Sequence, residues 1–232
     1  MIKKIFFYGL LSTVATGALH AQDTGEDKLG AWYMYFGTNK LSEKWSLHTE
    51  AQFRFYETAS SFNQLLLRTG ANYHISDKAI ATLGYGYINT DGTFEELPNE
   101  ENSEEHRIFQ QFILKNTVGK FAFEHRYRIE QRFIDAQAGS STQHRGRYRL
   151  QLTYPLNDKW FLNAYDEIFI NFQDDLFGQN RLYGAVGYKA SKDLSFQLGF
   201  LKNHFEDTQF DRLQLAVFFN TDLRKKQASA NQ

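Results

Sequence analysis

Apolar and polar residues alternate with a period of two along most of this chain. In the segment 45–57 the odd positions include Trp45, Leu47 and Phe53, and the even positions are mostly polar or charged. The segments 120–134 and 143–154 repeat the pattern, with apolar or aromatic residues on one face and arginines at successive positions of the other. This period is typical of β-strands whose two faces meet different surroundings.

Eight further segments have the same character, although two of them alternate less regularly. Gln110 and Asp166 lie on otherwise apolar faces of those two. Alternating segments of about ten residues are typical of tilted strands that cross an outer membrane. The eight segments are 29–38, 63–75, 79–90, 105–115, 160–172, 180–190, 194–205 and 210–221.

The connections between these segments are of two kinds. Short, polar turns recur every 34 to 42 residues, at 41–44, 75–78, 117–120, 156–159 and 190–193. Longer connections lie between them, at 57–62, 91–104, 135–142, 173–179 and 206–209. Short turns at one end and longer loops at the other are expected of the periplasmic and extracellular ends of a barrel. Pro98 and Pro155 both fall in connections, where the missing N–H does no harm to a sheet.

The pattern therefore predicts an all-β fold, a single up-and-down antiparallel transmembrane β-barrel over residues 29–221. Eleven segments can be recognised, whereas single-chain bacterial barrels close with even strand numbers. We expect about ten to twelve strands, with twelve favoured and the missing strand near the N-terminus before Leu29.

The first 21 residues predict a cleavable signal peptide. A basic start at Lys3 and Lys4 is followed by an apolar stretch and by Ala21 at the expected cleavage site. A buried N-terminal helix or strand is the alternative. A short segment, 22–28, would precede the barrel, and a basic, polar tail, 222–232, would follow it. The expected location is the outer membrane of a Gram-negative bacterium.

Composition supports a two-faced barrel and excludes some functions. Aromatic residues make up 16% of the chain, yet its mean hydropathy is −0.54. A barrel reconciles the two values because one strand face meets lipid and the other meets water. There is no cysteine and therefore no disulfide framework, and a net charge of −1 gives no case for nucleic acid binding. A secreted soluble β-sandwich or a soluble closed barrel is the alternative, but its strands would seldom carry arginine at every second position.

Two tryptophans follow short turns directly. Trp45 and Trp160 each come after a lysine-bearing turn. Because an indole ring combines an apolar body with a polar N–H, we expect both at the periplasmic membrane boundary.

Several short motifs resemble a known family. The turn at 41–45 precedes a strand with the spacing Glu50-x-x-x-Arg54, and further motifs lie at 107–111, 126–132 and 218–222. With these motifs the chain resembles an uncharacterised family of outer-membrane β-barrel proteins of Gram-negative bacteria, classed as a domain of unknown function. The resemblance covers nearly the whole mature chain and implies the fold and the location, but no substrate. The basic tail after Phe219 departs from the terminal aromatic residue with which such barrels commonly end.

The polar faces carry a set of charges that we expect to point into the lumen, since a mid-membrane arginine facing lipid would cost about 2–4 kcal/mol. They could form an interlocked network that fills a narrow lumen, or line a pore that favours anions. The candidates are Glu50, Arg54, Arg68, Arg107, Glu124, Arg126, Arg128, Glu130, Arg132, Arg145, Arg147, Arg149, Glu167, Arg181 and Arg212.

Other candidate chemistry is weaker. The acidic stretch from Asp91 to Glu105 lacks the ligand spacing of a calcium loop and is interpreted as a solvated loop. Ser140, Ser141 and His144 lie close in sequence, but no third group completes a nucleophilic site.

We therefore expect a non-enzymatic outer-membrane barrel, either a narrow channel or a structural or interaction protein, without cofactor or metal. Its expected partners are outer-membrane lipid and the barrel-assembly machinery, and any solute is unknown. A lipid-modifying barrel enzyme of the outer leaflet is the functional alternative.

Overall fold

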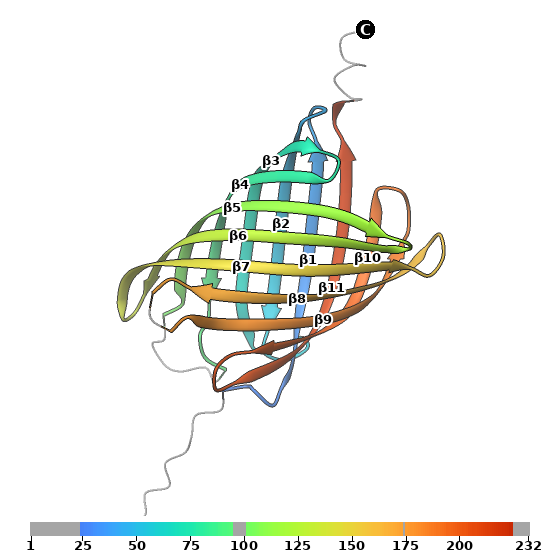
Figure 1. The fold of residues 1–232 in the computed structure, drawn as a ribbon. Coiled ribbons are helices and arrows are strands. Elements are labelled where there is room, and N and C mark those ends of the chain that lie inside the picture. Colours follow the sequence, from blue (N-terminus) through green and yellow to red (C-terminus); the bar gives the residue numbers. More distant parts are fainter. Residues whose placement is uncertain (1–23, 95–100, 174, 225–232) are drawn as a thin grey trace, which may run out of the picture.

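The eleven strands of the described chain close into one barrel (Figure 1). The computed structural model describes residues 24–94, 101–173 and 175–224. The signal peptide predicted over 1–21 and most of the predicted tail lie outside these residues. In the described ranges, no helix is long and apolar enough to span a bilayer.

The strands follow the predicted alternating segments closely. Their bounds are β1 Leu29–Lys40, β2 Trp45–Phe55, β3 Phe62–Ser76, β4 Ala79–Thr90, β5 Ser103–Val118, β6 Phe121–Ala136, β7 Gly139–Pro155, β8 Trp160–Asn171, β9 Phe177–Lys189, β10 Leu194–His204 and β11 Gln209–Asp222.

The barrel closes through a parallel pair. Consecutive strands pair antiparallel as hairpins, whereas β1 pairs with β11 in parallel, from Leu29 opposite Asp211 to Lys40 opposite Asp222. The preference for twelve strands is wrong, although the count falls inside the predicted range. Each hairpin reverses the strand direction, so an odd number of strands leaves the first and last strands pointing the same way. The predicted antiparallel arrangement therefore fails only at this closing seam.

Three of the short turns share one hydrogen-bonding scheme. Ser42, Asn157 and Ser191 each accept hydrogen bonds from the backbone N–H groups two and three residues further on, at donor–acceptor distances between 2.9 and 3.3 Å. A short polar side chain that satisfies its own backbone in this way favours a turn over a continued strand. The nearly repeated turn sequences thus have a common structural cause.

One predicted loop is wrong. The segment 135–142 is not an extended connection, because β6 and β7 are joined by only two residues, Gln137 and Ala138, before Gly139 at φ 116°. β7 begins to pair with β8 only at Arg145, so its first residues project beyond that neighbour. Polar residues there indicate a strand exposed to water rather than a break in the strand.

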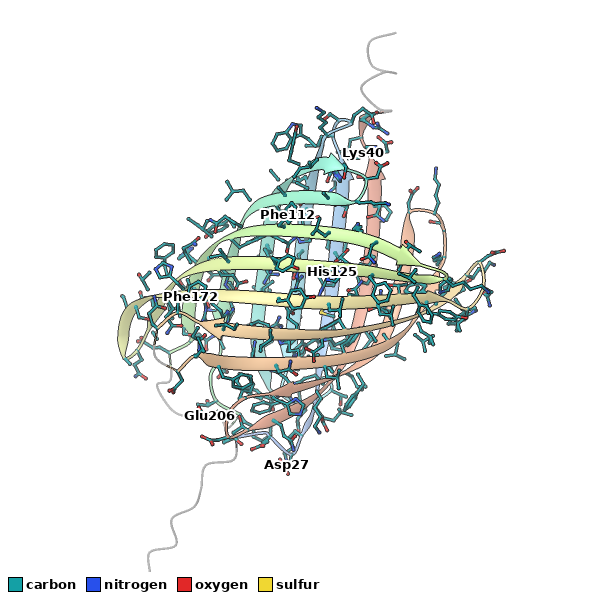
Figure 2. The ribbon with its side chains drawn as sticks, viewed as in Figure 1. Asp27, Lys40, Phe112, His125, Phe172 and Glu206 are labelled. Carbon is teal, nitrogen blue, oxygen red and sulfur yellow. The ribbon has the colours of Figure 1, made fainter. Side chains whose placement is uncertain are left out.

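The two faces of the wall have opposite character. Large apolar side chains such as Leu83, Leu182 and Leu198 are exposed on the outer face, whereas many charged side chains on the inner face are buried. Phe112 and His125 mark the outer face of β5 and β6 (Figure 2). A soluble sandwich would bury its apolar face between two sheets, so the closed barrel with an apolar exterior is inconsistent with that alternative.

Part of the inner wall is apolar. Trp32, Met34, Tyr183, Leu201 and Ala216 form a buried cluster on β1, β9, β10 and β11. Most of the charged inner residues lie across from it on β5, β6 and β7. The lumen is therefore asymmetric, with an apolar cluster that faces an arginine-rich wall.

The closing seam can be tested with an introduced disulfide, because the chain has no cysteine of its own. Asn39 and Thr221 lie opposite each other across β1 and β11, and the Thr221 hydroxyl donates to the Asn39 side-chain oxygen at 2.6 Å. We expect the pair Asn39→Cys and Thr221→Cys to oxidise readily in the folded barrel, as judged by a shift on a non-reducing gel. The control pair, Asn39→Cys with Val217→Cys, places the thiols about 13 Å apart along the strand and should stay reduced. Equal oxidation of both pairs would contradict the parallel register.

Candidate functional site in the barrel lumen

The inner faces of the strands enclose a cavity of about 960 Å³. Its lining runs from Thr38 and Asn220, beside the short turns, to Tyr56 and Phe205, beside the longer loops. Fourteen of the fifteen predicted lumen residues line this cavity, and the other, Glu130, lies fully buried among its arginines. Alternation along each strand positions these side chains, because every second residue faces the same side of the wall.

The strand register places arginines directly opposite one another. Arg107 lies opposite Arg132, Arg128 opposite Arg147, and Arg126 opposite Arg149. Like charges opposite each other on one face destabilise a sheet. This part of the barrel therefore needs carboxylates close to each pair.

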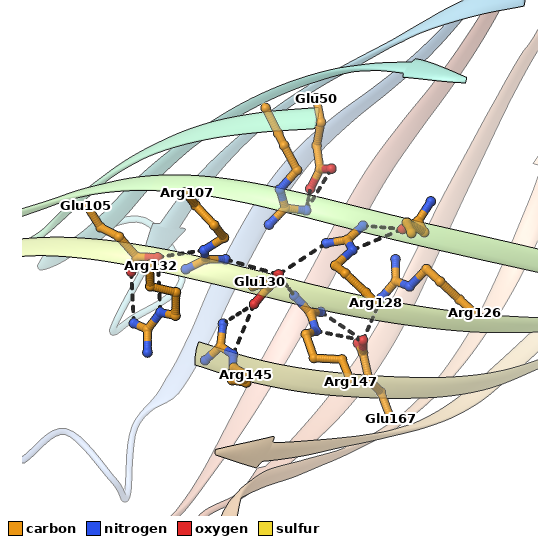
Figure 3. Close-up of polar contacts among 12 residues, drawn as sticks. Glu50, Glu105, Arg107, Arg126, Arg128, Glu130, Arg132, Arg145, Arg147 and Glu167 are labelled. Carbon is orange, nitrogen blue, oxygen red and sulfur yellow. Dashed lines mark hydrogen bonds and ion pairs between the residues drawn. The ribbon is translucent and has the colours of Figure 1, made fainter. Parts of the chain in front are cut away.

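Glu130 supplies the central carboxylate (Figure 3). Its Oε2 accepts from Arg145 Nη2 at 2.6 Å, and its Oε1 accepts from Arg147 Nη1 at 2.8 Å. Arg107 and Arg128 lie slightly farther away, with N–O distances of 3.5 and 3.6 Å. The fully buried Glu130 carboxylate thus interacts with four guanidinium groups.

Two further glutamates extend the network across the wall. Glu167 accepts from Arg126 Nη2 at 2.6 Å and is 2.8 Å from Arg147 Nη2. Glu105 accepts from Arg107 Nε at 2.6 Å and from Arg132 Nη2 at 2.8 Å, so it bridges an opposed arginine pair. Buried charges are tolerated when they are paired and hydrogen-bonded in this way.

The prediction of a solvated acidic loop over 91–105 is wrong at its end, because β5 already begins at Ser103. Glu105 lies buried in this strand and joins the lumen network. The signal that could have found it is its spacing, since Glu105 lies two residues before Arg107 and shares its face. Residues 95–100 of the same acidic stretch lie outside the described residues.

Two smaller pairs lie apart from the Glu130 network. Glu50 accepts from Arg68 Nη1 at 2.9 and 3.0 Å, and Glu124 accepts from Arg149 Nη2 at 2.7 Å. Arg68 and Arg128 also lie over the fully buried Phe109 ring, with the guanidinium carbon of Arg128 4.6 Å from its centroid. A Cβ atom at Gly84 would collide with that ring, so glycine makes room for the ring here.

Three predicted lumen arginines have no carboxylate in ion-pair range among the described residues. Arg54 and Arg181 lie over the Trp32 ring, and Arg212 donates to the backbone oxygens of Lys28 and Asp211. The structure therefore does not bring these three into the Arg/Glu network. Trp32 itself was not singled out in the sequence because both faces of β1 are apolar.

The other predicted residues lie outside the lumen. Trp45 and Trp160 are about half exposed on the outer face and pack on Tyr73 and Tyr188 of the neighbouring strands, with ring centroids 4.9 and 4.8 Å apart. Both stand at the short-turn end of the barrel.

The serines and the histidine considered as a nucleophilic site are not brought together. Ser140 donates to Asp135 at 2.9 Å and lies four residues before His144 on the same strand, about 13 Å away along β7. In the described ranges, no group of three or more histidine and acidic side chains is placed to hold a metal ion.

Comparison with known proteins identifies the family. The sequence of residues 29–214 matches the family described as a protein of unknown function, DUF2490. The chain belongs to the DUF2490 family. The predicted resemblance to an uncharacterised outer-membrane barrel family is thereby confirmed. No curated protein matches the chain in sequence.

A solved structure shares the fold of this DUF2490 barrel. The NanC porin matches it with a TM-score of 0.50 at 10% sequence identity, and the match covers 82% of this chain and 98% of the porin. At this identity the likeness shows the fold alone, a porin-like β-barrel.

The Glu130 cluster can be tested by removing one charge. Glu130→Gln keeps the side-chain volume but leaves four guanidinium groups without their shared carboxylate. We expect the free energy of unfolding to fall by about 3–5 kcal/mol, measured by urea titration of the refolded barrel. The control Glu101→Gln changes an exposed residue and should stay within about 0.5 kcal/mol of the parent. A loss for Glu130→Gln no larger than that of the control would contradict the described network.

Proposed function

We propose that this chain is a non-enzymatic outer-membrane channel of low conductance for small anionic solutes. The observation that carries the proposal is the charge of the lumen wall. Among the described residues, eleven arginines and Lys115 line the cavity, against four glutamates, with Glu130 buried behind them. Rings and rows of basic side chains favour anions in a pore.

The carboxylates do not cancel this charge. They pair mainly with arginines of β5, β6 and β7, and they leave Arg54, Arg181 and Arg212 outside ion-pair range. Inside a closed barrel, the remaining positive potential is screened less than at an open surface. An anion entering the lumen therefore meets a net positive wall.

The lumen is narrow as well as charged. Barrels near eight strands are filled by side chains, whereas those of sixteen or more leave an open channel. Eleven strands lie between these limits, and the guanidinium groups around Glu130 occupy part of the interior. We infer that only small solutes pass and that currents are small.

The exterior supports a membrane location. Exposed leucines and phenylalanines cover the outer wall, and Trp45 and Trp160 lie at its short-turn end, where we place the periplasmic boundary. A leader over 1–21 would direct export. Outer-membrane lipid and the barrel-assembly machinery are the partners that this location implies.

Two measurements test the location. In a Gram-negative host, the full chain should fractionate with the outer membrane and lose its leader. On a gel, the unheated protein should migrate faster than the boiled protein, because a closed barrel resists unfolding by detergent. Recovery as soluble periplasmic material would overturn the proposal.

Ion selectivity tests the channel itself. In planar bilayers under a KCl gradient, we expect small currents whose reversal potential favours chloride over potassium. Arg132→Gln should reduce this preference for chloride, because it removes one positive charge from the cavity wall. Glu105 remains paired with Arg107 in this variant, so no carboxylate is left without a partner. Cation selectivity, or an intact barrel without current, would contradict the proposal, and the second result would favour a sealed structural barrel.

A further inference from the structure

The lumen contains a pair of arginines that the Arg/Glu network does not use. Arg54 of β2 and Arg181 of β9 both lie over the ring of Trp32 on β1. Their guanidinium carbons are 3.8 and 4.9 Å from the ring centroid. The β1–β2 hairpin and the distant strand β9 thus bring two positive charges to one indole ring.

Neutral side chains hold these arginines in place. Arg54 donates from Nε and Nη2 to the Gln52 side-chain oxygen at 3.0 and 2.6 Å, and from Nη1 to Gln64 at 2.6 Å. Arg181 donates from Nε to Asn203 at 3.4 Å, and no described residue accepts from its two terminal nitrogens. Both arginines line the cavity, so their remaining N–H groups can serve a solute.

Two buried donors beside the pair also lack partners. Trp32 Nε1 and Gln214 Nε2 have no hydrogen-bond partner among the described residues, although the two residues are 6% and 2% exposed. They lie opposite each other across the β1–β11 seam, and Trp32 also lies opposite Arg54. An unmade hydrogen bond at a buried donor costs free energy, so this arrangement favours an acceptor that the chain does not supply.

From this juxtaposition we infer a binding subsite for an oxyanion group, such as a carboxylate, sulfate or phosphate, at Trp32, Arg54 and Arg181. Guanidinium groups present parallel N–H donors that match the oxygens of such groups. The Trp32 ring contacts both guanidinium groups, and the Phe169 ring also contacts that of Arg181 at 4.7 Å. A cation–π contact leaves the positive charge in place, whereas an ion pair with a carboxylate would neutralise it. This inference rests on the proposed function, because a solute would reach the subsite through the proposed channel.

Tryptophan fluorescence can detect this binding without any current. The double variant Trp45→Phe and Trp160→Phe leaves Trp32 as the remaining tryptophan of the chain's three. We expect its emission, recorded for the refolded barrel in detergent, to change saturably on titration with acetate, sulfate or phosphate at constant ionic strength against chloride. The order of the three midpoints shows which oxyanion the subsite prefers.

Substitutions in the same background locate the site. Arg54→Gln and Arg181→Gln should each raise the midpoint about tenfold or more. If either variant fails the heat-shift assay for a folded barrel, Arg54→Lys or Arg181→Lys takes its place. A lysine keeps the charge but loses the paired donors, so it should raise the midpoint several-fold. Lys202→Gln, a matched loss of charge on the outer face, should leave the midpoint unchanged.

The outcomes separate the subsite from the channel. Chloride-selective currents with a linear, unsaturable fluorescence response would overturn the subsite and leave the channel proposal standing. A saturable response that depends on Arg54 and Arg181, in a barrel without current, would uphold the subsite and overturn the channel. A midpoint unaffected by substitution of either arginine would overturn the subsite.

Discussion

The contact of Glu130 with its surrounding guanidinium groups is the interaction on which the lumen depends. The barrel register sets arginines opposite arginines at three places on β5, β6 and β7, an arrangement that repels unless carboxylates lie nearby. Glu130, Glu167 and Glu105 lie close enough to hydrogen-bond to members of these pairs. Because all of these groups are buried together, each charge is tolerable only while the others stay in place.

The same arrangement fixes where positive charge remains available. Glutamates gather on the arginine-rich wall, whereas the wall formed by β1, β9, β10 and β11 has an apolar cluster around Trp32 and no glutamate or aspartate among its cavity-lining residues. Arg54 of β2 and Arg181 of β9 contact the Trp32 ring instead of a carboxylate. Arginines that pair with glutamates and arginines that remain available to a solute therefore lie in different parts of one narrow lumen.

The outer face of the barrel also contains a few polar side chains. A strand has two faces, so every residue given to the lumen leaves its neighbours to the exterior. Gln110 and Asp166, which interrupt the apolar pattern, do lie on the outer face, where Gln131 and Asn180 satisfy them by hydrogen bonds. Polar groups on an apolar wall are thus paired within the chain.

The sequence alone determined the strands and which side chains share a face, because a period of two is a local property of the backbone, but it ended β6 and began β7 several residues too far from their shared turn. It therefore indicated most of the charged lumen residues, including Glu50, Arg128 and Arg147. It could not determine the closing seam, since the count of strands and the pairing of β1 with β11 join residues about 180 positions apart. For the same reason it missed Trp32, whose neighbours Arg54 and Arg181 are brought together only when the barrel closes. Glu105 was missed for another reason: its spacing from Arg107 is a local signal, but its partner Arg132 lies across the β5–β6 hairpin.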